Sequence, residues 1–403
     1  MGKIILHCDM NNFYASVECA LNPELRKYPV AVCGDVEERH GIVLAKNIKA
    51  AAHKIKTGEA IWEAKQKCKN LVIVPPNFQE YMKFSKAARE IYSRYTSEIE
   101  PFGPDECWLD ITGTAKNITE GERVAYRIKE EIKRELGVTV SVGVSFSKIF
   151  AKLGSDMKKP DAVTVIPEEN YLDVIGDLPV SDILGVGPST ARKLKLYCVE
   201  TISELAAFSK EMEKKLFGKC GEDLWYCANG MDCAKIISRD SETVDKTVGN
   251  GITLPKDLFE NEDVWKTVLA LSQEIGHRLM LNEKKAKDVS ITVKDSAFVT
   301  NHWHCHLDGY TSSPYVIANA AFRLFENGYM WQKPVRAVTV RASNLALSDI
   351  PVQVSMFDNV KDESKRQLVS ETVEKIRDRF GTDSIMNAVV LKAVKKDKTG
   401  IPF

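Results

Sequence analysis

Long hydrophobic runs are absent from the sequence. No stretch of its 403 residues approaches the length of a membrane span, and the first residues, MGKIILHCDMNNFY, lack the apolar core of a secretory signal. The ten cysteines are scattered and include no CxxC pair, which argues against a disulfide framework in a chain without a signal. We therefore expect a cytoplasmic protein with free thiols and no membrane attachment.

An excess of charge of either sign is also absent. Lysine plus arginine and aspartate plus glutamate both number 56, so the formal net charge is zero. That balance argues against a protein that holds nucleic acid by overall charge alone, although it is compatible with local patches. The 44% of hydrophobic residues can form true cores, and the length predicts two to four domains.

The spacing of hydrophobic residues divides the chain into parts of different character. Up to about residue 166, strand-like runs alternate with amphipathic helices, including a helix over 79–98 and a strand over 101–110. From about 167 the segments are short helices punctuated by glycine and proline. The polar stretch ISRDSETVDKTVG indicates a linker. Beyond it the pattern predicts strand, helix, strand, strand, helix and strand, up to about 345.

Three carboxylates stand out at the ends of predicted strands. Asp9 ends the first strand, and Asp105 and Glu106 adjoin each other directly after Pro104. If the two strands are neighbours, the three side chains converge, and such oxygen ligands suit Mg²⁺. Two such ions can activate an attacking oxygen and stabilise a leaving one in phosphoryl transfer. Spacing alone leaves an alternative open, in which Asp9 is a turn or N-cap residue and the pair is a solvated strand end.

Longer segments supply the context, namely HCDMNNFYASVE, PDECWLDITG and VSVGVSFSKIFAKLGSDMKKPDAVTVI. In this order they resemble the Y-family DNA polymerases, the translesion enzymes, and most closely the bacterial DinB (polymerase IV-like) and UvrX-type branch. The resemblance extends through most of the chain. It implies an α+β multidomain fold: a right-hand polymerase with palm, fingers and helical thumb, plus a little-finger domain of a four-stranded sheet and two helices.

The resemblance also implies domain limits. The palm would comprise 1–20 and 76–166, the fingers 21–75, and the thumb, with a helix-hairpin-helix, 167–240. A linker over 241–246 would lead to the little finger at 247–347 and to a C-terminal tail at 348–403. The implied function is template-directed, low-fidelity DNA synthesis for damage bypass by a monomeric nucleotidyltransferase.

The same resemblance assigns the three carboxylates a role. Asp9, Asp105 and Glu106 would be the catalytic residues and would hold two Mg²⁺ ions, with the Met10 carbonyl as a further metal ligand. The 3′-hydroxyl of primer–template DNA would attack the α-phosphate of a dNTP and release pyrophosphate. Protein groups would contribute positioning and charge stabilisation rather than a covalent intermediate.

The residues implied at the nucleotide are two aromatic side chains and a lysine. Tyr14 stands at the family's steric gate, where its ring would exclude a ribose 2′-hydroxyl; the alternative is an ordinary core aromatic. Phe13 adjoins the same nucleotide-binding site but has the pattern of a core residue. Lys159 matches the family's triphosphate-binding lysine, a compact charge suited to phosphate. In isolation Lys159 or its neighbour Lys158 would be a solvated surface residue, and Lys152 is a further basic position of the same segment.

One departure from the family concerns the fingers. Where the family commonly has a tyrosine and an arginine for the β- and γ-phosphates, this sequence has Ile48 and Ala51. Loss of a charge-assisted hydrogen bond costs about 1.5–3 kcal/mol, so weaker dNTP binding is expected. This motivates an alternative function, a catalytically weak factor that binds DNA and a sliding clamp. A two-metal nuclease is a third possibility.

Segments for binding duplex DNA follow. Gly185 and Gly187 lie in a turn that resembles a helix-hairpin-helix and would expose backbone N–H groups to phosphate; a plain helix connector is the alternative. In the little finger, period-two alternation predicts a polar sheet face that carries Lys294, Arg341 and Ser343. That face is either simply solvated or, by the resemblance, a platform for the DNA backbone.

A histidine-rich segment, NHWHCH, suggests a different chemistry. His302, His304 and His306 would share one face of a strand, as transition-metal ligands can. However, side chains at such positions tend to diverge, and no fourth ligand is evident. We therefore favour exposed polar or DNA-adjacent histidines over a zinc site.

The tail contains a short motif, QVSMF. It resembles the pentapeptide by which bacterial polymerases dock into the sliding clamp, with Gln353, Met356 and Phe357 entering an apolar pocket. A loop that contacts its own domain is the alternative. Clamp binding would raise the local concentration of an uncharged enzyme on DNA.

Overall fold

A computed structural model describes residues 2–35, 41–231, 236–237 and 245–349, together with 368–369, 372–377, 379–381, 384–385 and 388. The chain divides into two compact units, which are described separately. The first is built mainly from Met1–Gly34 and Gly41–Glu242, and the second mainly from Thr243–Gly400. Within the described residues, no helix is long and apolar enough to cross a membrane.

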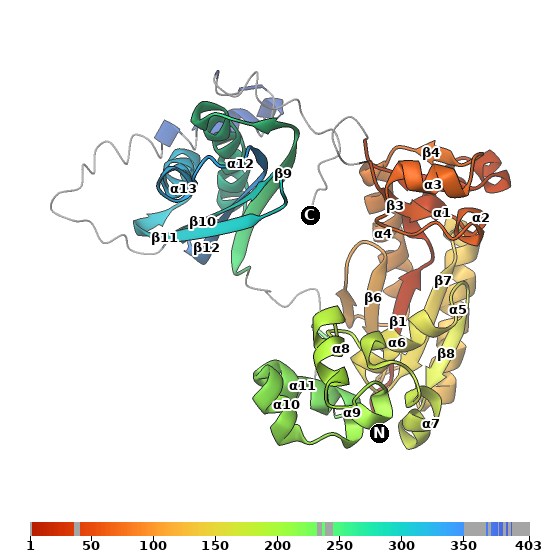
Figure 1. Ribbon diagram of the computed structural model, residues 1–403. Coiled ribbons are helices and arrows are strands. Elements are labelled where there is room, and N and C mark those ends of the chain that lie inside the picture. Colours follow the sequence, from red (N-terminus) through yellow and green to blue (C-terminus); the bar gives the residue numbers. More distant parts are fainter. Residues whose placement is uncertain are drawn as a thin grey trace. The chain divides into compact units, whose positions relative to one another are not determined.

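The first unit is built on a five-stranded sheet (Figure 1). In spatial order its strands are β5 (Ile99–Pro101), β6 (Glu106–Asp110), β1 (Ile5–Met10), β7 (Val140–Ser145) and β8 (Val163–Ile166). The central strand β1 pairs with β6 on one side and β7 on the other, antiparallel in both cases. All six residues of β1 are buried, so neither of its faces meets solvent.

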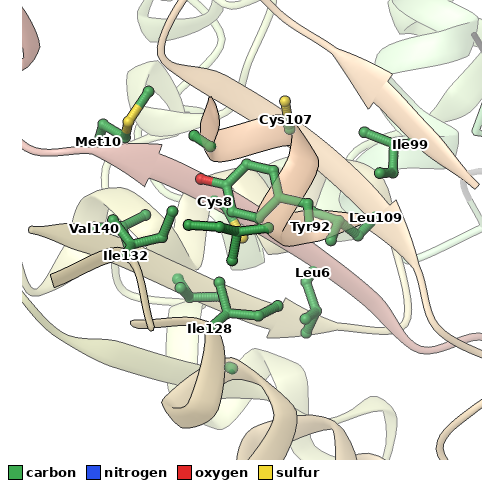
Figure 2. Packing of buried hydrophobic residues seen from close by; sticks show 14 of the residues in the cluster. Leu6, Cys8, Met10, Tyr92, Ile99, Cys107, Leu109, Ile128, Ile132 and Val140 are labelled. Carbon is green, nitrogen blue, oxygen red and sulfur yellow. The ribbon is translucent and has the colours of Figure 1, made fainter. Parts of the chain in front are cut away.

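One face of β1 meets the main hydrophobic core. Its side chains Leu6, Cys8 and Met10 pack with residues of two long helices, α4 (Phe78–Tyr92) and α5 (Ile118–Leu136). Figure 2 shows Tyr92 of α4 and Ile128 of α5 within this cluster. Residues i, i+2 and i+4 of a strand share a face, so the opposite face of β1 carries Ile5, His7 and Asp9.

That opposite face packs against α6 (Lys148–Met157), as the contact of Ile5 with Ala151 shows. A glycine in β7 makes the approach close. A Cβ atom on Gly143 would lie 1.9 Å from the carbonyl oxygen of Ala151, so only glycine fits there. The absence of a side chain thus lets α6 lie directly over the strand that carries Asp9.

A smaller sheet follows the first helix, α1 (Phe13–Leu21), and a 3₁₀ turn, η1 (Pro23–Lys27). Its strand order is β3 (Val43–Lys46), β2 (Val30–Cys33) and β4 (Val72–Val74). The accompanying helices are α2 (Ile48–Ala52) and α3 (Ile61–Lys67), which contribute Ala50, Ile61 and Ala64 to a separate small core. The stretch between β3 and β4 therefore contains two short helices.

The rest of the first unit is helical. Its elements are η2 (Glu168–Asn170), α7 (Tyr171–Ile175), η3 (Val180–Asp182), α8 (Pro188–Lys195), α9 (Ile202–Ala207), α10 (Lys210–Phe217) and α11 (Lys219–Ala228). They share a core that includes Phe150 and Leu153 of α6. The helical segment is thus anchored to the same helix that covers the face of Asp9.

The second unit is a four-stranded antiparallel sheet with two helices (Figure 1). The strand order is β11 (Thr300–Thr311), β10 (Lys284–Asp295), β12 (Val335–Leu347) and β9 (Thr247–Leu258). The helices α12 (Asn261–Leu281) and α13 (Pro314–Gly328) pack against Val289, Ile291 and Val293 of β10. The predicted order of strand, helix, strand, strand, helix and strand is confirmed.

Two expected elements differ from the structure. The helix predicted over 79–98 ends at Tyr92, and the Thr96 hydroxyl instead donates a hydrogen bond to the Asp110 carbonyl (2.6 Å). The strand predicted over 101–110 is a hairpin, because the chain turns at Gly103, whose φ is 91°. The Phe102 N–H donates to the Glu106 carbonyl (2.9 Å) and closes this turn.

Candidate active site

Strand pairing brings the three carboxylate residues together. Asp9 of β1 lies opposite Glu106 of β6 in the antiparallel register, and the Met10 N–H donates to the Asp105 carbonyl (3.0 Å). The expectation that the two strands are neighbours is therefore confirmed. Asp9 is 4% exposed, and the other two side chains are partly buried at the same end of the sheet.

Two lysines of the α6 segment, which is α6 together with residues 158 and 159, contact these carboxylates. Lys159 Nζ lies 2.7 Å from Asp9 Oδ2, and Lys152 Nζ lies 3.2 Å from the same oxygen and 2.9 Å from Glu106 Oε2. Asp156 contacts both lysines, at 3.3 Å and 2.8 Å. The close packing of α6 on β1 is what delivers these ammonium groups to the carboxylates.

The electrostatics of the cluster reflect both burial and mutual repulsion. Burial raises the pKa of Asp9, and Lys159 offsets part of that rise. Burial, followed by the charges of Asp9 and Glu106, raises the pKa of Asp105 to about 6. Burial also acts to raise the pKa of Glu106, but contacts with His7 and Lys152 outweigh it and hold that pKa at about 2. The cluster therefore favours additional positive charge.

The chemistry of these donors suits a hard divalent cation. Carboxylate oxygens are ligands that Mg²⁺ takes from proteins, together with water and substrate phosphates. In the described residues, however, no three or more His, Cys, Asp and Glu side chains are already arranged around a metal position. Lysine ammonium groups contact the oxygens of Asp9 and Glu106 instead. The three carboxylates fit such an ion because they offer oxygen donors and because a cation would relieve the repulsion among them.

The aromatic residues beside the carboxylates form one stacked group. Phe13 is 4% exposed and belongs to the core, whereas Tyr14 is half-buried and packs against it. The Tyr14 ring stacks on Tyr81 of α4, with 4.4 Å between ring centroids and 19° between planes, and meets Phe78 edge-on. The Tyr81 hydroxyl donates to Glu18 Oε1 (2.6 Å), which fixes the ring beneath Tyr14.

Tyr14 faces the carboxylates as well as the aromatic residues. Burial raises the pKa of its hydroxyl, and the nearby charge of Asp105 adds to the rise. An aromatic ring is thus held rigidly next to the acidic cluster. The sequence alone could not show that Tyr81 supports Tyr14.

The two positions that depart from the family pattern lie on the surface. Ile48 is 61% exposed and Ala51 is exposed, at the two ends of the first turn of α2. Neither side chain can donate a hydrogen bond to phosphate. Of the nearby cations, Lys49 donates to the Lys27 carbonyl (3.0 Å) and Lys46 to the Thr57 hydroxyl (3.2 Å).

The glycine turn before α8 is open. Gly185 has a φ of 98°, which favours glycine, and Gly187 is the N-cap of α8. A Cβ atom on either glycine would meet nothing within 4 Å. The element before the turn is the 3₁₀ segment η3 rather than a full helix. Backbone N–H groups at the start of α8 can therefore be approached by a ligand.

One face of the second unit's sheet is polar, as the alternation predicted. Register places Ser290 beside Arg341 and Thr292 beside Thr339, and Lys294 belongs to the same face. A hollow on this face is lined by Thr292, Lys294 and Thr339, among others. Ser343 lies opposite Asp288 on the same face, one step beyond Arg341.

The glycines of β9 that lie next to this face have a packing role. Gly249 lies opposite Arg341 and Gly251 opposite Thr339 in the pairing of β9 with β12. A Cβ atom on Gly251 would lie 2.2 Å from the Thr339 hydroxyl oxygen. Packing between strands thus explains Gly251 without any ligand.

The three histidines share one exposed face of β11, as expected. The His302 and His304 rings, and the His304 and His306 rings, lie 6.4 Å apart between centroids. His302 Nδ1 lies 2.9 Å from the Thr292 hydroxyl and His306 Nδ1 lies 2.7 Å from Asp288. Throughout the part of the chain that the structure describes, no metal-binding group of His, Cys, Asp and Glu is found, these histidines included.

Two residues near the carboxylates were not anticipated, His7 and Ser155. His7 is fully buried, with Nε2 3.4 Å from Glu106 Oε2 and Nδ1 2.8 Å from the Ser155 hydroxyl. A signal was available in the sequence, since residues two apart in a strand share a face and His7 precedes Asp9 by two. The tail residues Gln353, Met356 and Phe357 lie outside the described residues.

The fold is that of a Y-family DNA polymerase. A solved structure described as a Y-family DNA polymerase chimera matches with a TM-score of 0.75 and 22% sequence identity, covering 85% of this chain and 99% of that one. The predicted fold class is thereby confirmed. The impB/mucB/samB family model matches residues 8–156, and that of the impB/mucB/samB family C-terminal domain matches residues 245–356. The chain belongs to this family.

Curated relatives extend the match over the whole chain. A DNA polymerase IV of Acetivibrio thermocellus is 48% identical over 392 residues, which cover 97% of this chain and 98% of the relative. A DNA polymerase IV of Clostridium acetobutylicum is 35% identical, covering 98% and 100%. DNA polymerase IV 1 of Bacillus subtilis is 33% identical, covering 100% and 96%.

Proposed function

We propose that the protein is a template-directed DNA polymerase of the translesion type, which adds dNTPs to a primer 3′-end with low fidelity. The observation that carries this proposal is the pairing of β1 with β6, which brings Asp9, Asp105 and Glu106 to one end of the sheet. Relatives named DNA polymerase IV, matched over nearly their full length, support the activity.

Asp9, Asp105 and Glu106 would hold two Mg²⁺ ions, with the Met10 carbonyl as a further ligand. When bound, the ions would polarise the reacting phosphate and stabilise the charge that develops on it. Burial and the mutual repulsion of the carboxylates raise the pKa of Asp9 and of Asp105, and a bound cation would stabilise their ionised forms, which supports this assignment. A divalent metal requirement agrees with membership of the family.

The lysines and aromatic residues would bind the nucleotide. Lys159 is bound to Asp9 here, and its ammonium group can neutralise triphosphate charge from that position. Tyr14 would lie against the sugar and exclude a 2′-hydroxyl. Phe13 would support Tyr14 from the core behind it. The exposed Ile48 and Ala51 supply no phosphate contact, so the affinity for dNTP rests on the α6 segment.

Duplex DNA would contact three places. These are the open turn at Gly185 and Gly187, the polar sheet face with Lys294, Arg341 and Ser343, and the histidine row next to it. The contacts would be to the backbone, which position the duplex without reading its sequence. The corresponding domain limits are palm 1–20 and 76–166, fingers 21–75, thumb 167–240, linker 241–246, little finger 247–347 and tail 348–403.

The motif Gln353–Phe357 would dock the enzyme on a sliding clamp. Its similarity to clamp-binding pentapeptides supports this proposal, as does its position directly after the four-stranded sheet. We further propose that the enzyme acts as a monomer in the cytoplasm. The clamp would then raise the local concentration of a protein whose overall charge is zero.

Primer extension with Mg²⁺ and dNTPs tests the activity. Replacement Asp105→Asn should abolish extension and leave duplex binding intact. The matched control is Asp110→Asn, which alters a carboxylate at the opposite end of β6 and should preserve extension. If no product forms at saturating dNTP, even with Mn²⁺, the result would instead favour the alternative function, a factor that binds DNA and the clamp. Shortening of DNA without dNTPs would indicate a nuclease.

A further inference from the structure

A buried histidine lies directly behind the carboxylate cluster. His7 is 0% exposed and occupies the centre of β1, on the same face as Asp9. Its Nε2 atom lies 3.4 Å from Glu106 Oε2. Burial of a polar ring costs free energy unless its nitrogen atoms have partners, so the ring's contacts need an explanation.

The ring is fixed from two further directions. His7 Nδ1 lies 2.8 Å from the Ser155 hydroxyl. Because the ionised Glu106 carboxylate can only accept, a neutral His7 that bonds it carries its hydrogen on Nε2, and Nδ1 accepts from the Ser155 hydroxyl. The Trp108 ring meets the imidazole edge-on at 5.1 Å, and Trp108 Nε1 is itself bonded to the Lys148 carbonyl (3.0 Å). These contacts leave Nε2 directed at Glu106.

Glu106 is held through one of its two oxygens. His7 Nε2 and Lys152 Nζ both approach Oε2, at 3.4 Å and 2.9 Å. The Glu106 side chain is 19% exposed, so it is not fully enclosed by these partners. Groups that orient a metal-binding carboxylate typically change metal affinity or activity by 10–100-fold when removed.

We propose that His7 is a positioning residue, which holds Glu106 in the orientation that receives a divalent metal ion. This inference rests on the proposed function, because it takes Glu106 as a metal ligand. His7 does not touch the nucleotide or the reacting atoms. It acts through Glu106, and Ser155 acts through His7 by fixing the ring.

The test measures Mn²⁺ binding by electron paramagnetic resonance, without turnover. The protein is bound to primer–template DNA with a dideoxy-terminated primer and the matching dNTP. His7→Leu fills the space but removes both nitrogen atoms, whereas His7→Gln keeps an amide nitrogen where Nε2 lies. We expect His7→Leu to raise the half-saturating Mn²⁺ concentration by about 10–100-fold and His7→Gln to raise it clearly less.

A second pair of variants keeps the proposal testable if His7→Leu does not fold. Ser155→Ala removes the hydroxyl that holds His7, and Ser145→Ala removes a buried hydroxyl of β7 that donates to the Ile166 carbonyl (2.9 Å). Only Ser155→Ala should weaken Mn²⁺ binding. The folding of each variant is checked by thermal unfolding.

Two results would overturn the proposal. One is wild-type Mn²⁺ binding in folded His7→Leu or, if that variant does not fold, in Ser155→Ala. The other is equal weakening in His7→Leu and His7→Gln, which would show that a nitrogen atom facing Glu106 does not matter for metal binding. Failure of the proposed function looks different: the unmodified protein would then neither bind Mn²⁺ in this complex nor extend primers.

Discussion

Replacement of Glu213 by glutamine should stabilise the protein at neutral pH. Glu213 lies in α10 and is 0% exposed, and neither of its carboxylate oxygens has a hydrogen-bond partner in the described part of the chain. The neighbouring helix α11 packs closely there, since a Cβ atom on Gly221 would lie 2.1 Å from the Glu213 carbonyl oxygen. Burial raises the pKa of Glu213 from 4.5 to about 7.

The magnitude follows from that rise. One pKa unit corresponds to about 1.4 kcal/mol, so ionised Glu213 costs roughly 3 kcal/mol of folding free energy. Between pH 4.5 and about 7 the native state binds more protons than the unfolded state. The free energy of unfolding therefore falls as pH rises through this window. The native protein is more stable at low pH, where Glu213 is protonated.

Urea unfolding at pH 4.5 and pH 8 measures the effect, with hydrogen exchange of peptides from α10 and α11 as the local readout. Glu213→Gln should be more stable than wild type by up to about 3 kcal/mol at pH 8 and indistinguishable from it at pH 4.5. The control is Glu211→Gln, an exposed carboxylate of the same helix whose pKa is lowered by a backbone hydrogen bond. It should destabilise at pH 8. Equal stability of Glu213→Gln and wild type at pH 8 would refute the reasoning.

Further predictions concern the nucleotide, the DNA and the clamp. Tyr14→Ala should increase ribonucleotide incorporation by at least about tenfold, equivalent to about 1.4 kcal/mol of discrimination; unchanged sugar selectivity would remove Tyr14 from the gate. Arg341→Ala should weaken duplex binding similarly for all sequences and reduce the slope of log affinity against log salt by about 1; an unchanged slope would contradict a phosphate contact. Deletion of 353–357 should abolish stimulation by the clamp and preserve basal primer extension; loss of both would point to misfolding.

The position of the carboxylates could be predicted because it depends on strand ends. To predict that Asp9 and Glu106 lie together, it was enough to expect two adjacent strands with their acidic residues at the same end. Hydrophobic alternation identified both strands. His7 was missed although the same alternation placed it beside Asp9. A histidine in a buried strand has several possible roles, and only the approach of α6, with Ser155, shows which partners it has.

The errors have a tertiary origin. The hydrophobic period of α4 continues past Tyr92, but Thr96 bonds the Asp110 carbonyl and the Tyr95 hydroxyl bonds Glu131 of α5. These contacts with distant segments draw the chain out of the helix and into β5. The hairpin was missed because Pro104 is compatible with a strand's first residue, while the reversal at Gly103 depends on a backbone conformation that sequence does not reveal.

The groups proposed to act in the reaction and the positions that depart from the family pattern lie on different elements. Asp9, Glu106 and the two lysines Lys152 and Lys159 form a contiguous network between β1, β6 and the α6 segment. Ile48 lies on the surface of another element and is not part of that network. We therefore expect the missing phosphate contacts at Ile48 and Ala51 to lower the affinity for the triphosphate. The groups around the reacting atoms should be undisturbed. Ile48 and Ala51 are therefore compatible with the proposed polymerase activity, and we expect their cost to fall on nucleotide affinity.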